Sequence, residues 1–531
     1  MTRRSVKARF AVVAGILVAG MGLAVPANAD PLADTDAAAA PVQWGACPPG
    51  SLDGVPPAEL PQFSCATYTV PLDYQHPRRE TISLALMRRT ANKAGQRIGS
   101  LFLNPGGPGG PGFDLPTVGG FIFQPAVLDR FDLIGFDPRG VARSTPLRCF
   151  KTNEEANAVL SRITVVPVTR QQISDTVQAS IDYSGFCARN AGDLLAHMST
   201  ADVVRDLDLL RRAVGDRKLN YVGFSYGTLI GATYANMFAR SARAIVIDGN
   251  VDPRLRTNNG VEYDRERAQG FEISLDAYLK RCAVEGPKCA FSAGNPRAKF
   301  DEIRDRLRQG PIAVPGGGQI TLDSFTSTVA GTLYSPSQLA PLAAALQGVY
   351  NILHPTSALT ANTVDSLKVF SQTNKVATRD SRADTPYTSD DSYLGVNCTD
   401  KPFPRVPQLV PFIASSWERE SPTFGRYQAF QDTLDCASWP LRHPDPYRGP
   451  WDRSTANPVL VIGNFFDPAT QYKFSQRMAR ELGNARLLSV DSFGHTILGG
   501  SVCADTITTD YLINLKAPRP GVVCQPTRQP F

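Results

Sequence analysis

The stretch that decides the fold reads Leu219-Asn220-Tyr221-Val222-Gly223-Phe224-Ser225-Tyr226-Gly227 and continues as an apolar segment to about residue 238. Residues 219–222 have the composition of a buried strand, and residues 226–238 are expected to form a helix. A Gly-x-Ser-x-Gly turn between a strand and a helix is typical of a nucleophile elbow, in which tight packing excludes side chains at both glycines. The sequence therefore predicts Ser225 as an exposed nucleophile.

Strands and helices alternate on both sides of this turn. Strands are predicted at 81–87, 98–103, 131–136, 244–247, 458–462 and 485–490, and helices from residue 200 and over 470–482. This alternation predicts a mostly parallel sheet with helices on both faces. Residues 256–440 lack buried strands but contain predicted helices at 265–280, 298–308 and 339–353. We therefore expect a core of residues 30–255 and 441–531, split by a mainly helical cap at 256–440.

A serine nucleophile needs a base and an acid, and in α/β-hydrolase folds the acid and then the histidine follow the serine along the chain. Of the five histidines, His495 alone lies just after the last predicted strand. Asp467 follows the strand before it, while Asp248 and Asp252 remain alternatives for the acid. The acid would fix the imidazole tautomer and stabilise the imidazolium.

An oxyanion hole requires two backbone N–H groups near the nucleophile. The first is expected from Tyr226, which follows the serine. The loop from Asn104 to Gly112 is rich in glycine and proline and follows the strand at 98–103. We expect Gly107 to supply the second donor, with Gly106 as the next choice. A phosphate-binding loop is disfavoured because no Gly-Lys-Ser/Thr follows and the prolines remove N–H donors.

Together these motifs resemble the secreted actinobacterial tripeptidyl aminopeptidases, which are α/β-hydrolase serine exopeptidases related to prolyl aminopeptidases. The resemblance rests on residues 104–112, 136–140, 144–146, 223–228, Asp467 and His495, and it spans nearly the whole chain after residue 29. Three positions depart from the family pattern: Gln471 replaces a usual Pro, Thr496 a usual Gly, and Ala142 lies in a segment that more often reads Gly-x-Gly. The resemblance implies an α/β-hydrolase fold with a helical cap and the release of short peptides, chiefly tripeptides, from free N-termini without a cofactor.

An enzyme of this kind must recognise a charged α-ammonium, and the cap is the material available for it. Acids of the cap that could bind the ammonium are Glu262, Glu266 and Asp400, with Asp264, Asp390 and Asp391 as further members of the set. The alternative for each of these acids is an ordinary charged side chain exposed to solvent at the surface. Three alternatives remain for the function: a prolyl aminopeptidase activity, an exported carboxylesterase or lipase, and a catalytically silent binding protein.

The first 29 residues have the features of a secretory signal peptide. Four basic residues in the first ten precede an apolar run of about 16 residues, shorter than the roughly 20 needed for a membrane span. Cleavage is expected near Ala29, and a propeptide could extend to about residue 41. The formal charge of +6 falls to +2 without this segment, so nucleic-acid binding is not expected, nor is stable membrane association.

Ten cysteines agree with export, because disulfides persist in oxidising compartments. They are Cys47, Cys65, Cys149, Cys187, Cys282, Cys289, Cys398, Cys436, Cys503 and Cys524. Their spacing favours pairing in sequential order, with each bridge closing a local loop. No metal site is expected, since the chain has no Cys-x-x-Cys or His-Glu-x-x-His motif. No feature of the sequence sets the oligomeric state.

Overall fold

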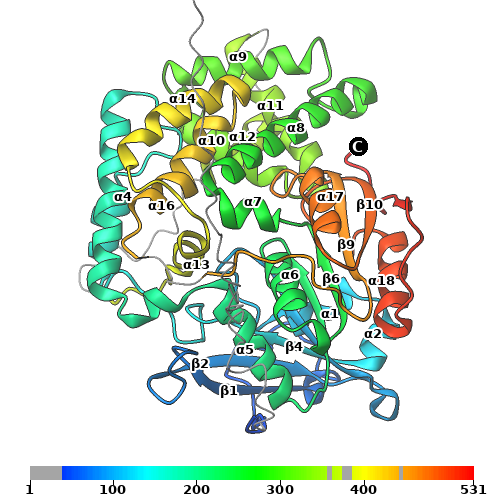
Figure 1. The fold of residues 1–531 in the computed structure, drawn as a ribbon. Helices are drawn as coiled ribbons and strands as arrows, with labels where there is room; N and C mark the ends of the chain where they lie inside the picture. Colours follow the sequence, from blue (N-terminus) through cyan, green and yellow to red (C-terminus); the bar gives the residue numbers. More distant parts are fainter. Residues whose placement is uncertain (1–38, 356–360, 373–384, 442–445) are drawn as a thin grey trace, which may run out of the picture. The chain divides into compact units, whose positions relative to one another are not determined.

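A mostly parallel sheet forms the centre of the molecule (Figure 1). The computed structural model describes residues 39–355, 361–372, 385–441 and 446–531; the predicted signal peptide and its cleavage point lie outside these ranges. In spatial order the strands are β1 (Phe63–Pro71), β2 (Thr81–Arg89), β4 (Phe131–Phe136), β3 (Gly99–Asn104), β5 (Leu219–Phe224), β6 (Ala242–Asp248), β9 (Val459–Phe466), β10 (Ala485–Phe493) and β11 (Val523–Cys524). β2 pairs antiparallel with β1 and β4, and the other neighbours are parallel. The predicted α/β-hydrolase architecture is confirmed.

The central strands are buried on both faces because helices cover each side. Consecutive β5 residues Tyr221 and Val222 belong to different hydrophobic clusters, as expected when successive side chains point to opposite faces. The cluster of Tyr221 includes Leu207 of α5 (Thr200–Ala213) and Ile230 of α6 (Gly227–Met237). The cluster of Val222 includes residues of α2 (Pro125–Arg130) and α18 (Val502–Asn514). Short helix α1 (Gly119–Ile122) precedes α2, and α17 (Tyr472–Glu481) links β9 to β10.

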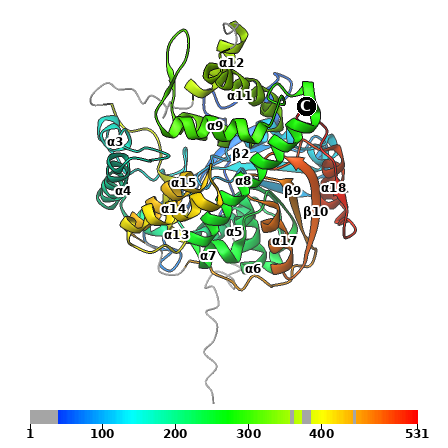
Figure 2. The same ribbon diagram turned by 90° about the horizontal axis from the view of Figure 1, so that it is seen from above.

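Between β6 and β9, which are neighbours in the sheet, the chain leaves the core and forms a large group of helices. Figures 1 and 2 show this group on one side of the sheet. Its elements are α7 (Pro253–Asn258), α8 (Gly260–Glu285), α9 (Pro296–Arg308), the hairpin β7 (Ile312–Ala313) and β8 (Gln319–Ile320), α10 (Leu322–Thr332), α11 (Leu339–Leu353), α12 (Ala361–Gln372), α13 (Ser392–Asp400), α14 (Val410–Glu420), α15 (Gly425–Gln428) and α16 (Leu434–Ser438). We call this group the inserted helices.

Two helices from the earlier part of the chain join the inserted helices. α3 (Asn153–Leu160) and α4 (Arg170–Asn190) follow β4 in the sequence. Ile173 and Val177 of α4 pack against the cluster that contains Trp417 of α14, and Figure 1 shows α4 beside α14 and α16. The core predicted from the sequence covers residues 30–255 and therefore includes α3 and α4. In the structure α4 instead packs against the inserted helices.

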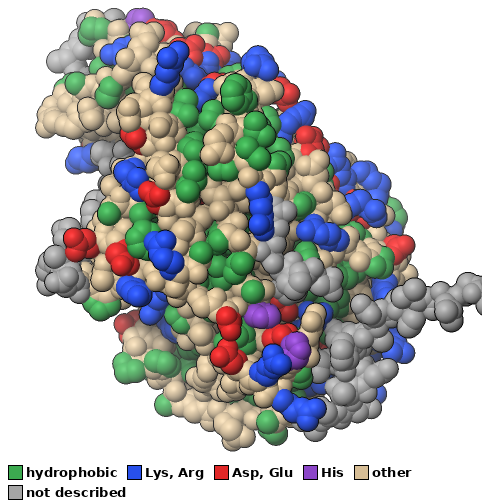
Figure 3. All heavy atoms as spheres, turned by 60° about the vertical axis from the view of Figure 1, so that its left-hand side comes forward, with side chains coloured by type: hydrophobic (Ala, Val, Ile, Leu, Met, Phe, Trp, Pro, Cys, Tyr) green, Lys and Arg blue, Asp and Glu red, His purple; other side chains and the backbone are tan. Residues whose placement is uncertain are grey.

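The surface carries both signs of charge. On the face shown in Figure 3, Lys and Arg side chains are interspersed with Asp and Glu. A face of this mixed kind does not build the strong single-sign field that steers a highly charged partner. Among the described residues, no helix has the length and apolar character required to cross a membrane.

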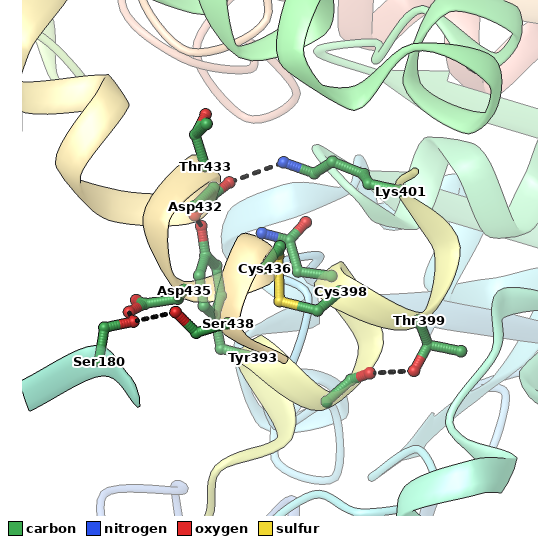
Figure 4. Close-up of a disulfide and its surroundings, with 12 residues drawn as sticks. Ser180, Tyr393, Cys398, Thr399, Lys401, Asp432, Thr433, Asp435, Cys436 and Ser438 are labelled. Atoms are coloured by element: carbon green, nitrogen blue, oxygen red, sulfur yellow. Dashed lines mark hydrogen bonds and ion pairs between the residues drawn. A yellow bond between two sulfur atoms is a disulfide. The ribbon is translucent and has the colours of Figure 1, made fainter. Parts of the chain in front are cut away.

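Five disulfides pair the ten cysteines in sequential order, as predicted. They are Cys47–Cys65, Cys149–Cys187, Cys282–Cys289, Cys398–Cys436 and Cys503–Cys524, with sequence separations from 7 to 38 residues. Cys398–Cys436 joins α13 to α16 within the inserted helices (Figure 4). Each of these bridges therefore closes a short loop, which restricts the conformations of the unfolded chain, and none of the five links its two ends.

Candidate active site

Ser225 lies in the sharp turn between β5 and α6. Its φ of 54° is in the left-handed region, which residues with a side chain rarely adopt. A Cβ added at Gly223 would lie 2.4 Å from the Gly227 carbonyl oxygen, and one added at Gly227 would lie 2.7 Å from Oδ1 of Asn104. Close packing therefore requires both glycines of the motif, and the strained turn is the form expected of a nucleophile elbow.

His495 and Asp467 lie together at the ends of β10 and β9. Nδ1 of His495 is 2.9 Å from Oδ2 and 3.0 Å from Oδ1 of Asp467. The backbone N–H groups of Ala469 and Thr470 donate to Oδ1 at 3.0 and 2.8 Å, and the Thr470 hydroxyl donates to Oδ2 at 3.0 Å. The buried carboxylate is thus held in one orientation against the imidazole, the arrangement needed to fix its tautomer.

The other ring nitrogen of His495 is free for chemistry. Nε2 is buried and has no hydrogen-bond partner within the part of the chain that the structure describes. The ring of Tyr334 packs edge-on against the imidazole, with the centroids 5.2 Å apart. A general base needs one nitrogen oriented by a partner and the other available to a proton: Asp467 orients Nδ1, while Nε2 makes no hydrogen bond to Ser225 or to any other described residue.

Asp248, one of the alternatives for the acid, connects the nucleophile turn with the histidine loop. Its carbonyl oxygen accepts the Ser225 N–H at 2.9 Å, and its Oδ2 accepts the N–H groups of Ile497 and Leu498 at 2.8 and 3.0 Å. Burial raises the pKa of Asp248 to about 6. No hydrogen bond to His495 is found for it in the described ranges, so its geometry fits the positioning of the two loops.

Asp252, the second alternative, belongs to the end of α7. Its carboxylate accepts the Leu255 N–H at 2.8 Å as the N-cap of that helix, and it also pairs with Arg477 at 3.0 Å. These contacts give Asp252 a structural role as the cap at the start of α7. Of the three candidate acids, Asp467 is the one that contacts His495.

The loop after β3 packs against the nucleophile turn. A Cβ at Gly106 would lie 2.8 Å from Cβ of Ser225 and 2.9 Å from the Tyr226 nitrogen. The N–H of Gly106 donates to Oδ1 of Asn104 at 3.0 Å, whereas no described residue accepts the N–H of Gly107. Gly106 and Gly107 both have left-handed backbone, with φ of 92° and 111°. This pattern favours Gly107 over Gly106 as the oxyanion donor.

A pocket opens beside Ser225, between the sheet and the inserted helices. The sheet side contributes Gly107, Ser225, Tyr226 and Thr470. The inserted helices contribute Arg256, Tyr263, Arg267, Tyr393 and Asn397, and Asp432 comes from the segment between α15 and α16. The side of α10 is closed by Tyr334, whose pKa burial raises to about 12. Such a mixture of aromatic walls and a few polar groups is typical of small-ligand sites. No group of acids, cysteines and histidines within the described ranges is arranged to hold a metal ion.

The cap acids expected to bind an ammonium do not line this pocket. Glu262 pairs at the surface with Arg265 at 3.3 Å, and Glu266 pairs with Arg477 at 2.8 Å. Asp400 accepts the Thr200 N–H at 3.0 Å and also the hydroxyl of that residue. The expectation that these three acids contact the substrate beside Ser225 is therefore corrected: none of them is among the residues that line the pocket, and each has a partner elsewhere in the described chain.

Asp432 is the carboxylate of the pocket wall, and it is not among the cap acids predicted from the sequence. It accepts Lys401 Nζ and Arg267 Nη1, both at 2.8 Å, and the Tyr393 hydroxyl at 2.6 Å. Burial opposes its charge, but Lys401 and Arg267 hold its pKa far below the usual value. Figure 4 shows Lys401 reaching toward Asp432. No sequence motif marks this residue, since its partners lie at 267, 393 and 401.

The three departures from the family pattern fall at structurally informative positions. Ala142 and Thr496 have φ of 39° and 66°, so both adopt the left-handed backbone for which glycine is suited. The side-chain amide of Gln471 donates to the carbonyl oxygen of Glu266 and joins the segment before α17 to α8. At Ala142 and Thr496 the backbone conformation is thus the one that glycine would adopt, although the side chains differ.

Comparison with known proteins places this architecture in a family. Residues 99–276 match the family described as alpha/beta hydrolase fold, and residues 421–524 match the family described as TAP-like protein. The serine protease Hip1 of Mycobacterium tuberculosis is 31% identical over 503 residues, which cover 91% of each chain.

Two further relatives carry different names. Carboxylesterase B of Mycobacterium tuberculosis is 30% identical over 549 residues, covering 96% of this chain and 97% of that protein. Tripeptidyl aminopeptidase of Streptomyces lividans is 28% identical over 484 residues, covering 88% and 84%. The chain therefore belongs to the TAP-like family of α/β-hydrolases and is a serine hydrolase of that family.

Proposed function

We propose that this serine hydrolase is an exported peptidase that releases short peptides, tripeptides foremost, from the free N-termini of peptides and proteins. The observation that carries the proposal is the composition of the pocket beside Ser225, whose far wall comes from the inserted helices. A pocket closed on that side would limit how far the acyl chain can extend beyond the scissile carbonyl. Two Streptomyces relatives named tripeptidyl aminopeptidase support the choice of a three-residue product.

The catalytic roles follow from the geometry of the site. Ser225 would attack the scissile carbonyl while Nε2 of His495 accepts its proton, and Asp467 would hold the Nδ1 proton of the imidazole. The N–H groups of Tyr226 and Gly107 would stabilise the oxyanion. His495 would then protonate the leaving amine, and water would hydrolyse the acyl-enzyme by the same steps in reverse.

Recognition of the α-ammonium is supported by the names of the relatives and not by an unpaired carboxylate in the pocket. Asp432 is the acid available there, and it already accepts two cations. An incoming ammonium would have to share Asp432 with Lys401 or Arg267. This makes the N-terminal preference the most informative part of the proposal to test.

The test compares free and N-acetylated peptides. Purified protein is incubated with matched peptides of the same sequence, and the products are identified by mass spectrometry, with Ser225→Ala as the control for contaminating peptidases. Tripeptide release from the free peptides alone supports the proposal. Equal cleavage of acetylated peptides would reject the exopeptidase assignment while leaving a serine peptidase.

A carboxylesterase is the second candidate. It is favoured by the carboxylesterase relative, which matches this chain over nearly its whole length. Peptidyl 4-nitroanilides and 4-nitrophenyl esters of the same acyl groups separate the two activities. An esterase would hydrolyse the esters without measurable turnover of the anilides, because only the amide requires protonation of a poor leaving group.

Export is proposed from the predicted signal peptide together with the disulfides. Five bridges are typical of proteins that fold in an oxidising compartment. N-terminal sequencing of protein recovered from the culture medium should give a chain that begins at or near Asp30. A chain retained in the cells with Met1 intact would contradict this part of the proposal.

A further inference from the structure

Arg256 is a buried cation without a carboxylate partner among the described residues. It lies on α7, is 3% exposed and lines the pocket beside Ser225. Within the described ranges no carboxylate oxygen lies within 4.0 Å of its guanidinium, and its one hydrogen bond runs from Nη2 to Oδ1 of Asn397 at 2.7 Å. A buried charge of this kind is costly unless a partner compensates for it.

Two further donors at the same place lack acceptors. Nε of Arg256 and Nδ2 of Asn397 are both buried and without a hydrogen-bond partner in the described chain. Asn397 is fully buried in α13 and also lines the pocket. Its Oδ1 accepts the hydrogen bond from Arg256, so the donor that remains unused is Nδ2. Buried polar groups are normally satisfied, and two neighbouring exceptions require an explanation.

Aromatic rings occupy the other surroundings of the guanidinium. Cζ of Arg256 lies 5.5 Å from the ring centroid of Tyr226 and 5.4 Å from that of Tyr263. These cation–π contacts stabilise the charge but supply no hydrogen-bond acceptor for the N–H groups at the edge of the guanidinium. An acceptor in the pocket would meet donors that are already fixed in place.

The nearby carboxylates are committed elsewhere. Asp432 is paired with Lys401 and Arg267, as described above, and Asp264 is paired with Lys401 at 2.7 Å. In Figure 4 Lys401 approaches Asp432 from a separate segment, with Tyr393 on the other side of that carboxylate. The charged groups that line the pocket, two arginines and one aspartate, therefore leave a net positive charge.

We propose that Arg256 and Asn397 form a subsite for a carboxylate of the substrate, namely the side chain of a glutamate or aspartate near the scissile bond. This inference rests on the proposed peptidase function and adds the class of peptide that the site prefers. The subsite adjoins the nucleophile, because Arg256 contacts the ring of Tyr226, the residue after Ser225. A carboxylate fits better than a neutral carbonyl because it supplies both the acceptor oxygens and the missing negative charge.

The test uses matched substrates that differ only in charge. Free tripeptidyl 4-nitroanilides carry either Glu or Gln at the first, second or third position, with alanine elsewhere, and the same six acyl groups are prepared as 4-nitrophenyl esters. At one position we expect kcat/KM to favour Glu over Gln by about 10- to 100-fold, the range for a hydrogen bond to a charged group. The ratio is an internal control, since general damage to catalysis affects both substrates.

Variants assign the preference to the subsite. Arg256→Gln should bring the ratio of Glu to Gln near one, and Arg256→Lys should retain part of it. The matched control is Arg254→Gln on the same helix, because the side chain of Arg254 is 63% exposed and pairs with Glu481 at 3.6 Å; it should keep the full preference. The ratio in the unaltered protein tests the proposal even if an Arg256 variant does not fold.

Failure of the subsite and failure of the peptidase assignment give different results. Hydrolysis of the esters without the anilides would reject the proposed function, and the Glu preference among the esters would still test the subsite. A Glu-to-Gln ratio near one at every position in both series would overturn the inference. So would a strong preference that is unchanged in a folded Arg256→Gln variant.

Discussion

Replacing Asp467 by asparagine tests whether this carboxylate sets the tautomer of His495. Oδ1 of Asp467 accepts the N–H groups of Ala469 and Thr470 at 3.0 and 2.8 Å, and Oδ2 lies 2.9 Å from Nδ1 of His495. An asparagine keeps both backbone hydrogen bonds only if its carbonyl oxygen occupies the Oδ1 position. Its NH₂ group then faces Nδ1, which favours the tautomer protonated at Nε2 and prevents His495 from accepting the Ser225 proton.

The structure also bounds the size of the effect. The flipped amide would preserve the productive tautomer, but it turns NH₂ toward two backbone donors and leaves both unsatisfied. Each buried unsatisfied donor costs about 1–3 kcal/mol, so the productive form is disfavoured by roughly 2–6 kcal/mol. At about 1.36 kcal/mol per factor of ten, kcat should fall by roughly 30-fold to 3 × 10⁴-fold. The corresponding change in chymotrypsin-type proteases lowers kcat by about 10⁴-fold, which lies within this range.

The assay is steady-state kcat on a tripeptidyl 4-nitroanilide, with circular dichroism to show that the variant is folded. Asp252→Asn is the matched control, because this aspartate caps α7 and pairs with Arg477 without contacting His495. Asparagine caps a helix as well as aspartate does, so this variant loses chiefly the ion pair with Arg477, which lowers stability by about 1 kcal/mol or less, and kcat should stay close to the unaltered value. Full activity of Asp467→Asn, or a larger loss in Asp252→Asn, would refute the assignment of the acid.

Three further predictions address the nucleophile, the strained loop and a buried acid. Ser225→Ala should unfold at the same temperature as the unaltered protein and lose turnover by roughly 10⁴-fold or more, measured on the same anilide; retained activity would reject the whole site. Thr496→Gly should raise the free energy of unfolding by about 0.5–1 kcal/mol in urea titrations, because glycine relieves the left-handed strain at φ 66°; no gain would mean that neighbouring contacts offset the strain. Burial raises the pKa of Asp435 to about 7, so the folded chain retains a proton that the unfolded chain releases above about pH 4, and stability should decline from about pH 4 to 7. Asp435→Asn can still accept the Ser180 hydrogen bond and should remove that decline, so its gain in Tm over the unaltered protein should grow from pH 4 to 8; a constant difference would contradict the raised pKa.

The strands, helices and turns near the nucleophile could be predicted because the spacing of apolar residues and the residue types of a turn are properties of short segments. The strand predicted at 219–222 is β5 (Leu219–Phe224), and the predicted helix after Ser225 is α6. The positions of Ser225, Asp467 and His495 at the ends of strands followed from the same reasoning. Helix α4 was not predicted, although Thr169 and Gln172 form a capping box that marks its start.

By itself the sequence determined the alternation of strands and helices around the nucleophile turn, the glycines of that turn and the sequential pairing of the cysteines, since each depends on neighbours within a few tens of residues. Only the tertiary structure decided which charges face the pocket. Asp432, Lys401 and Arg267 form one buried network, while Arg256 is left without a carboxylate partner among the described residues. The same acidic and basic residue types occur throughout the insertion, so composition cannot distinguish a paired side chain from an unpaired one. The packing of α7, α8 and α13 distinguishes them, because a buried charge is stable only where the fold brings a partner to it.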